Sequence, residues 1–494
     1  MSVLIGVVKV SNEMIQISVF IGLTALIALV TYLKCRGHDR SQDSNKEFFL
    51  ASGGLSWVFI AGSITLTNLS TDQLIGMNGN QMAVVVWWEL AAVVGLAILA
   101  KVFLPVYYKN NCTTTTELLE KRYNDKNIRA VIAGLFLFGN IFIFLPSVLY
   151  GGSLFMKSMF NADFEILTMA AMFAVVGAAY AIFGGLRAVA ISDTFSGILL
   201  LGMGLLIVYL SMNAINFDFS GIPAERLTLI GNDESPIPWH VLLTGMIFIQ
   251  TFYWSTNQTI TQRAMAAPNL KEAQKGVFTA GLIRLLIVPP MIVIPGIVSY
   301  KLYGDIGDLA YGRIAGDLLP VWLSGAFAAA IAAAVLTTFN SILNSSAALY
   351  VCDIHERYIN ETPNVAKLSA VFSIVLVAIA LTLVPVYAKA ESIINLVQEL
   401  FGLLSMPILS TFIVGLLFRN VEAKAAMFAA LFGAAMYGYF VFVWMPLHYI
   451  HMMCFTLFAC VGLALALNRF VFGNKAQLIF KTKGQTEELQ QVTR

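Results

Sequence analysis

Charged residues are scarce in this chain. Asp, Glu, Lys and Arg together make up 12% of its 494 residues, whereas soluble proteins carry about a quarter. Apolar residues make up 58% of the chain, and its mean hydropathy is +0.79. This composition excludes an ordinary soluble domain and indicates a protein that crosses a membrane many times.

The sequence also has few cysteines and lacks common catalytic motifs. Its 5 cysteines are too scattered for a disulfide framework or a metal cluster. It contains no nucleotide loop, zinc-ligand pair or nucleophile elbow, and its weakly charged start lacks the cleavage site of a signal peptide. We therefore expect neither an enzyme nor a nucleic-acid-binding protein. The expected partners are the lipid bilayer and a small-molecule solute.

Long apolar stretches are present throughout. Stretches of about 20 residues, the length that crosses a bilayer, predict about thirteen transmembrane helices. They cover residues 17–34, 53–78, 83–107, 127–157, 164–183, 187–211, 239–264, 276–302, 318–350, 365–386, 391–418, 422–443 and 447–470. The expected fold class is an all-α polytopic membrane protein.

Lys and Arg are distributed unevenly over the intervening loops. Most of the 30 such residues fall in alternate loops on one side, beginning with Lys34, Arg36, Arg40 and Lys46 in the first loop. Cytoplasmic loops are enriched in Lys and Arg. The distribution predicts an N-terminus outside, a C-terminus inside and an odd number of crossings.

Polar residues interrupt the second apolar stretch between Ser63 and Gly76. The segment reads S-I-T-L-T-N-L-S-T-D-Q-L-I-G and includes Asn68, Asp72 and Gln73. Hydrocarbon has no water to satisfy such groups, so they must face protein or a wet cavity. A polar break in a membrane helix is typical of a transporter binding site, although small polar residues also join neighbouring helices.

A second polar break lies in the stretch 239–264, at S-T-N-Q-T (255–259). With the N-terminus outside, the first broken helix starts inside and the second starts outside. Two broken helices of opposite direction, each opening five crossings, predict a five-plus-five inverted repeat. The expected parts are an N-terminal helix and cytoplasmic loop at 1–52, a first half at 53–211, an extracellular loop at 212–238, a second half at 239–418, and two peripheral helices with a cytoplasmic tail at 419–494.

Hydroxyl and amide side chains follow one face of the stretch 318–350. Thr337, Asn340, Ser341 and Asn344 have the spacing of neighbours on a helix. Their oxygens could hold Na⁺ together with carbonyls freed in the first broken helix. Plain helix packing through small residues such as Ala332 fits the same pattern.

Few ionisable residues lie inside the predicted helices. They are Glu89, Asp193, Arg284 and Glu399, and each is a candidate functional residue because burying a charge in lipid is costly. Glu89 could accept hydroxyls of a neutral polyol or form an ion pair with Arg284. Asp193 could simply be solvated near the cytoplasmic surface, and Glu399 could be interfacial.

Several stretches, in the same order, resemble the solute:sodium symporters, in particular bacterial sodium–galactose (sodium/glucose-type) members. They are T-N-L-S-T-D-Q-L-I-G-M-N-G (67–79), W-W-E (87–89), F-G-G-L-R-A-V (183–189), F-Y-W-S-T-N-Q-T-I-T-Q-R (252–263), T-T-F-N-S-I-L-N-S (337–345) and Q-E-L-F-G (398–402). The resemblance implies a LeuT-like five-plus-five fold with one extra helix before it.

The resemblance also implies roles for single residues. Na⁺ would be bound by the carbonyls of Leu66, Leu69 and Ala334 and by the hydroxyls of Thr337 and Thr338. The solute would be bound by Asn68, Gln73, Glu89 and Gln398, with Tyr253 as an inner gate that stacks on a sugar ring and Trp254 beside it. Asp193 resembles a carboxylate on the sodium exit path.

Several positions depart from the galactose transporters, among them Ala92 in place of a Ser that helps hold sugar, and two of the departures concern candidate solute-binding residues. Gln250 stands where they have Asn, and Arg284 stands where they have Lys. We keep both as candidate solute-binding residues. Because Arg is a forked donor where Lys is a point charge, Arg284 could suit a different sugar or an anionic solute.

We interpret the chain as a secondary active symporter of the cell (inner) membrane, with many crossings. It would couple inward Na⁺ flow to uptake of a sugar or sugar-like polyol by alternating access. One alternative is a symporter of the same family for inositol, a sialic-acid-like carboxylated sugar, an amino acid or an organic acid. Another is a membrane sensor that binds solute without carrying it. Binding of an anionic solute should depend on Arg284, and binding of a neutral sugar should depend on Glu89.

Overall fold

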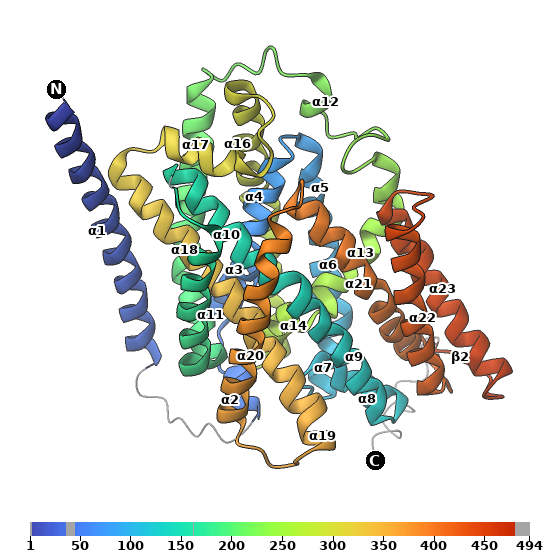
Figure 1. The fold of residues 1–494 in the computed structure, drawn as a ribbon. Helices are drawn as coiled ribbons and strands as arrows, with labels where there is room; N and C mark the ends of the chain where they lie inside the picture. Colours follow the sequence, from blue (N-terminus) through green and yellow to red (C-terminus); the bar gives the residue numbers. More distant parts are fainter. Residues whose placement is uncertain (1, 36–44, 162, 480–494) are drawn as a thin grey trace.

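The computed structural model describes residues 2–35, 45–161 and 163–479, which form a bundle of helices (Figure 1). The predicted all-α class is confirmed. Within the described chain, two strands of two residues each, β1 (Phe418–Arg419) and β2 (Gln477–Leu478), pair antiparallel. Arg36 and Arg40 of the predicted first loop and the tail from residue 480 lie outside the described residues, as do the side chains of Lys34, Lys46 and Asp72.

The first half of the bundle opens with two short helices in place of one, α3 (Trp57–Asn68) and α4 (Thr71–Gly79). It continues with α5 (Trp87–Leu90), α6 (Ala92–Ile98), α7 (Leu104–Lys109), α8 (Thr115–Tyr123), α9 (Lys126–Gly139), α10 (Leu145–Phe160) and α11 (Ile166–Ala214). The predicted stretches 164–183 and 187–211 both fall in α11, whose apolar parts are Ile166–Ala178 and Leu186–Ala214.

The second half repeats this pattern. It opens with α13 (Gly245–Ser255) and α14 (Gln258–Met265). It continues with α15 (Leu270–Leu286), α16 (Val288–Tyr303), α17 (Ala310–Leu318), α18 (Val321–Ala348), α19 (Glu356–Tyr358), α20 (Val365–Tyr387) and α21 (Ile393–Leu417). Short π-helical segments join α6 to α7, α9 to α10 and α18 to α19 at Leu99–Phe103, Asn140–Phe144 and Leu349–His355.

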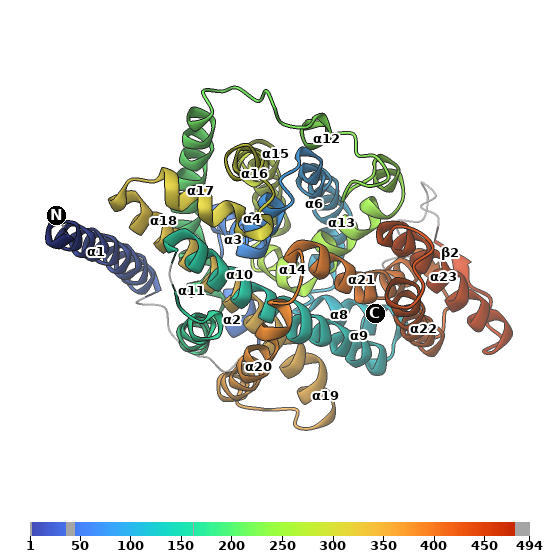
Figure 2. The ribbon, with the colours of Figure 1, turned by 45° about the horizontal axis from the view of Figure 1, so that its top comes forward.

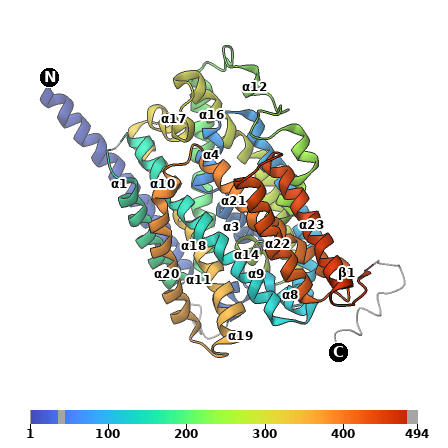
Figure 3. The same ribbon diagram turned by 45° about the vertical axis from the view of Figure 1, so that its right-hand side comes forward.

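The remaining helices lie at the edges of the bundle. They are α1 (Ser2–Cys35), α2 (Asn45–Leu50), α12 (Ala224–Leu227), α22 (Ala423–Phe442) and α23 (Tyr449–Phe470). Helix α1 stands beside α18 and α11 at one side (Figure 2), whereas α22 and α23 pack against each other and α21 at the other side (Figure 3). Buried residues make up 6% of the apolar part of α1 and 89% of that of α18. Helix α18 is therefore central and α1 is peripheral.

Both predicted breaks are present. At the first, Leu69 and Ser70 leave the helical backbone with ψ angles of 63° and 171°, and at the second Asn257 has a ψ of 120°. The Asn257 side chain accepts a hydrogen bond from the Thr259 N–H at 3.0 Å. Asn257 is therefore a side-chain N-cap of α14, and it satisfies an amide that a new helix leaves without a partner.

Ten helices of the described residues are long and apolar enough to cross a membrane, and Trp57–Asn68 and Ile166–Ala178 are shorter apolar helices. The two segments with polar breaks are not among the ten, because residues 69–70 and 256–257 divide them into shorter helices. The number of crossings, the orientation of the termini and the division into halves at 53–211 and 239–418 stay predictions.

Candidate solute and cation site

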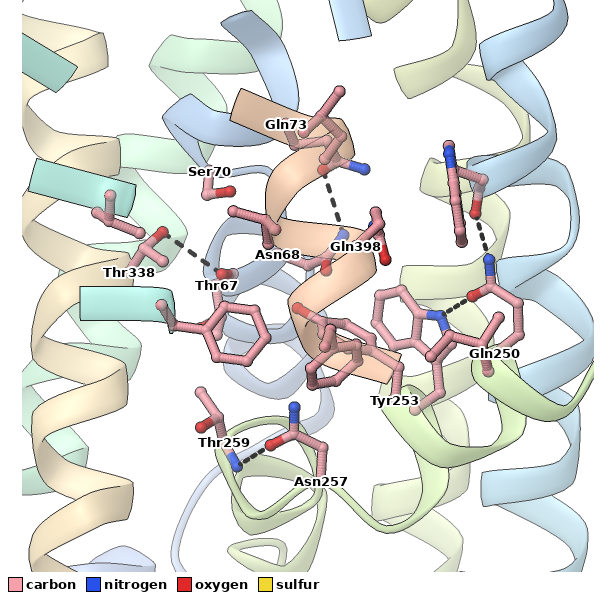
Figure 4. A pocket seen from close by; sticks show the side chains of 18 of the residues that line it. Thr67, Asn68, Ser70, Gln73, Gln250, Tyr253, Asn257, Thr259, Thr338 and Gln398 are labelled. Carbon is pink, nitrogen blue, oxygen red and sulfur yellow. Dashed lines mark hydrogen bonds between the residues drawn. The ribbon is translucent and has the colours of Figure 1, made fainter. Parts of the chain in front are cut away.

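The two broken helices meet at a cavity near the centre of the bundle. It contains about 840 Å³ of empty space, including its opening. All the predicted solute-binding residues except Arg284 line it: Asn68, Gln73, Glu89, Gln250, Tyr253, Trp254 and Gln398. These side chains come from α3, α4, α5, α13 and α21, and Figure 4 shows several of them around one space.

Glu89, which lines the cavity, forms a buried ion pair with Arg284, which does not line it. Their side chains are 1% and 0% exposed, and Arg284 Nη2 donates to Glu89 Oε1. Gln73 Nε2 donates to the same oxygen. This is the ion-pair alternative that the sequence left open for Glu89.

The second oxygen of Glu89 is arranged differently. Oε2 is buried and has no hydrogen-bond partner within the part of the chain that the structure describes. Buried acceptors normally find a donor, so this unpaired oxygen is the part of Glu89 that is left to accept a further hydrogen bond. Arg284 cannot offer its charge in the same way, because Glu89 neutralises it.

Amide side chains surround the pair. Asn68 Nδ2 donates to Gln73 Oε1 at 3.2 Å, and Arg284 Nη2 lies 3.3 Å from the same Gln73 oxygen. With its amide turned over, Asn68 would instead donate to Tyr253 Oη at 2.5 Å. The Asn68 amide can therefore present either a donor or an acceptor to this region.

Aromatic rings form the other wall. The rings of Tyr253 and Trp254 lie 5.3 Å apart and nearly perpendicular, and Phe401 packs edge-on to Tyr253 at 5.8 Å. Phe144 and Phe401 also line the cavity and were not predicted from the sequence. Aromatic residues are common in packing and at membrane interfaces, so no local signal marked these two.

Asn257 and Thr259 also line the cavity and were not assigned to the solute. Both lie in the second polar break, whose S-T-N-Q-T stretch was the signal that could have found them. Glu399 does not line the cavity and is partly exposed on α21.

The predicted cation ligands gather between α3 and α18. Leu66, Leu69, Ala334, Thr337 and Thr338 are all buried. Thr338 Oγ1 lies 3.4 Å from the Thr67 carbonyl oxygen, and Thr337 Oγ1 lies 3.1 Å from that of Ala334. Thr338 therefore faces an oxygen of α3, whereas the Thr337 hydroxyl bonds within its own helix.

The break in α3 explains why carbonyls are available there. The Ser70 N–H donates to the Asn68 carbonyl at 2.7 Å. In a continuous helix it would donate to the Leu66 carbonyl, which therefore lacks this bond. Uncharged hydroxyl and carbonyl oxygens suit a hard monovalent cation such as Na⁺. The donor set fits the predicted ion, and the role of each ligand stays a prediction.

Asp193 lies on α11 and is fully buried. Its Oδ2 accepts a hydrogen bond from Ser63 Oγ at 2.6 Å, and its Oδ1 has no partner among the described residues. The alternative of a solvated carboxylate at the cytoplasmic surface is therefore wrong. Its predicted place on the sodium exit path stays a prediction.

Comparison with known proteins identifies the chain's relatives. The model of the sodium:solute symporter family matches residues 48–433. An Escherichia coli (strain K12) protein, the uncharacterized symporter YidK, is 35% identical over 448 residues, covering 86% of this chain and 78% of that protein. The sodium/glucose cotransporter of Vibrio parahaemolyticus is 30% identical over 456 residues, covering 84% of this chain and 82% of its own length.

A mouse protein, sodium/myo-inositol cotransporter 2, is 28% identical over 439 residues, covering 79% of this chain and 65% of that protein. Among solved structures, the substrate-bound outward-open state of a Na⁺-coupled sialic acid symporter superposes with a TM-score of 0.81 at 18% identity. The match covers 94% of this chain and 99% of the other. This likeness confirms the LeuT-like fold.

These relatives are transporters and not enzymes, and Na⁺ is the ion that they carry with the solute. The chain is accordingly a multi-pass membrane protein that couples Na⁺ to the transport of a small solute. It belongs to the sodium:solute symporter family.

Proposed function

We propose that this symporter carries a neutral sugar or sugar-like polyol into the cell, driven by inward Na⁺ flow across the cell (inner) membrane. The observation that carries the proposal is the buried pair of Glu89 and Arg284. Among the described residues that line the cavity there is no Lys or Arg. A carboxylated solute would therefore have to compete with Glu89 for Arg284.

A neutral polyol suits the groups that are present. Asn68, Gln73 and Gln398 supply amides, and Glu89 Oε2 supplies an acceptor. Hydroxyls both donate and accept hydrogen bonds, so they can satisfy such a mixture. The ring of Tyr253 offers apolar contact for a sugar ring, with Trp254 packed beside it.

We propose that the break in α3 couples Na⁺ binding to solute binding. Leu66 and Leu69 of the cation site and Asn68 of the solute site belong to one turn of chain. Na⁺ bound between α3 and α18 would hold this turn in one arrangement and so order the Asn68 amide. A ligand can shift a conformational equilibrium only by its different affinity for the two states, and this shared turn gives both ligands such an influence in alternating access.

The test is uptake by proteoliposomes with an imposed Na⁺ gradient. The panel contains labelled glucose, galactose, myo-inositol, a sialic acid and a neutral amino acid, with a K⁺ gradient as control. We expect accumulation of a neutral sugar or inositol only with the Na⁺ gradient. Accumulation of the sialic acid alone would contradict the proposal and favour the carboxylated-sugar alternative.

A further inference from the structure

Gln250 lines the cavity, yet its amide is bonded to the protein on both sides. Nε2 donates to the Trp88 carbonyl at 2.8 Å, and Oε1 accepts from Trp254 Nε1–H at 2.9 Å. The other amide N–H has Met246 Sδ at 3.8 Å. Figure 4 shows Gln250 at the right of the cavity with two dashed lines leaving its amide.

These contacts leave little of Gln250 for a solute. A primary amide has two N–H donors and one carbonyl acceptor with two lone pairs. Both donors and one lone pair of Gln250 have partners in the protein. A solute hydroxyl that bound to the amide nitrogen would have to break the bond to Trp88.

Trp254 links Gln250 to the ion pair. Its indole is 1% exposed, and the Arg284 guanidinium carbon lies 4.8 Å from the centroid of the ring. Cations over a Trp face are attracted by the negative face of the ring. The indole is therefore one of the contacts that place Arg284, beside the Gln73 and Thr65 oxygens. Arg284 in turn holds Glu89.

The edge of the indole that carries its N–H is also confined by a second helix. A Cβ added at Gly95 of α6 would lie 2.7 Å from Trp254 Cδ1, closer than carbon atoms pack. Gly95 thus allows α6 to approach this ring directly. Gly95 and the Gln250 amide therefore contact neighbouring atoms, Cδ1 and Nε1, on one edge of the indole.

We propose that Gln250 is a positioning residue and makes no direct bond with the solute. It holds the Trp254 indole, and through it Arg284, in the orientation that presents Glu89 Oε2 to the cavity. This inference rests on the proposed function and specifies how the site is ordered. It separates Gln250 from Asn68, Gln73 and Gln398, whose amides remain solute ligands.

A double-mutant cycle tests this. Gln250→Met keeps the length of the side chain and removes both hydrogen bonds, and Trp254→Phe keeps an aromatic ring and removes the N–H. We expect each change to weaken solute binding by roughly 2- to 10-fold, the value of a neutral hydrogen bond. We expect the double variant to bind no more weakly than the poorer single variant, because both changes break the same connection.

Solute Kd is measured by equilibrium binding to purified protein, with Na⁺ half-saturation and the unfolding temperature recorded beside it. A multiplicative loss in the double variant would show that Gln250 and Trp254 act independently and would overturn the inference. Wild-type affinity in Gln250→Met would show that Gln250 has no role in solute binding. If Gln250→Met does not fold, unchanged affinity in Trp254→Phe overturns the inference. Failure of the wild type to take up any neutral sugar would instead overturn the proposed function.

Discussion

At the scale of single residues, the charges of Glu89 and Arg284 compensate each other inside the membrane. The two side chains are almost fully buried, and an uncompensated charge there would be costly. The Arg284 guanidinium also lies over the face of the Trp254 ring. The pair therefore supports both the stability of the bundle and the shape of the solute site.

Glu89→Gln should separate these two contributions. It keeps the size of the side chain but leaves Arg284 buried without a counter-charge, which typically costs about 3–5 kcal/mol. We expect a lower unfolding temperature and loss of solute uptake, measured on purified protein and in proteoliposomes.

The matched control is Glu89→Gln combined with Arg284→Met, which removes both charges. Replacing a buried pair with apolar groups is often neutral for stability, so the unfolding temperature should return toward that of the wild type. Uptake should stay lost because the Glu89 acceptor is missing. A double variant that transports at the wild-type rate would remove Glu89 from the site.

Thr338→Ala should raise the Na⁺ concentration needed for half-maximal uptake. It removes one oxygen between α18 and the broken end of α3. If that oxygen is worth as much as a hydrogen bond to a charged group, the rise is roughly 10-fold or more. Na⁺ dependence of uptake measures it.

Thr338→Ser keeps the hydroxyl and should behave as the wild type. Thr382→Ala on α20 removes an exposed hydroxyl that bonds only its own helix, so it should leave Na⁺ dependence unchanged. An unaltered Na⁺ requirement in Thr338→Ala would count against the cation site.

At the scale of elements, the site depends on how closely α6 approaches α13. Gly95 provides this approach, because a side chain there would meet the Gln250 backbone and the Trp254 ring. The contact joins the helix that follows Glu89 to the helix that carries the aromatic wall. Small residues commonly allow membrane helices to pack this closely.

Gly95→Ala should push α6 and α13 apart. Inserting a methyl group into a packed contact costs about 1–3 kcal/mol, so we expect a lower unfolding temperature and weaker solute binding. Gly134→Ala on α9 is the matched control, because nothing lies within 4 Å of the added carbon. Equal behaviour of the two variants would show that the approach at Gly95 is not tight.

At the scale of the whole molecule, α1 begins on the side where α12 lies, and α19 lies at the opposite side (Figure 1). The Lys and Arg distribution predicts that the side of α12 faces outward. Two exposed residues report on the two sides: Ser220 near α12, and Asn360 shortly after α19.

Cysteine labelling tests the orientation. A membrane-impermeant maleimide should label Ser220→Cys in intact cells and should label Asn360→Cys only after the cells are opened. The wild type, whose Cys112, Cys352 and Cys460 are buried, sets the background. The reverse pattern would show that the protein is inserted the other way.

His448, in the connection between α22 and α23, makes the stability depend on pH. Burial, followed by the charges of His451 and His240, lowers the pKa of His448 to about 4 from an ordinary 6.5. The folded state therefore favours the neutral ring. The unfolded state binds a proton first as the pH falls below 6.5, so stability present above that pH is lost between about 6.5 and 4.

We expect the unfolding temperature to fall when the pH is lowered from 7 to 5, and the fall to be smaller in His448→Gln. Thermal unfolding of purified protein at both pH values measures this. A variant with the same pH dependence as the wild type would show that His448 does not contribute.

Local patterns determined the class of this protein and the place of its two interrupted helices. A long apolar run must cross the bilayer, and a polar stretch inside it must leave the lipid. Both rules act within about 20 residues. The sequence alone therefore predicts the helix breaks around Asn68 and Asn257.

Only the tertiary structure decided which partners these residues have. Glu89 meets Arg284 across 195 positions of the chain, and Gln250 meets the Trp88 carbonyl across 162. No local pattern reveals whether a buried carboxylate or amide faces a solute or another side chain. That choice depends on how distant helices pack.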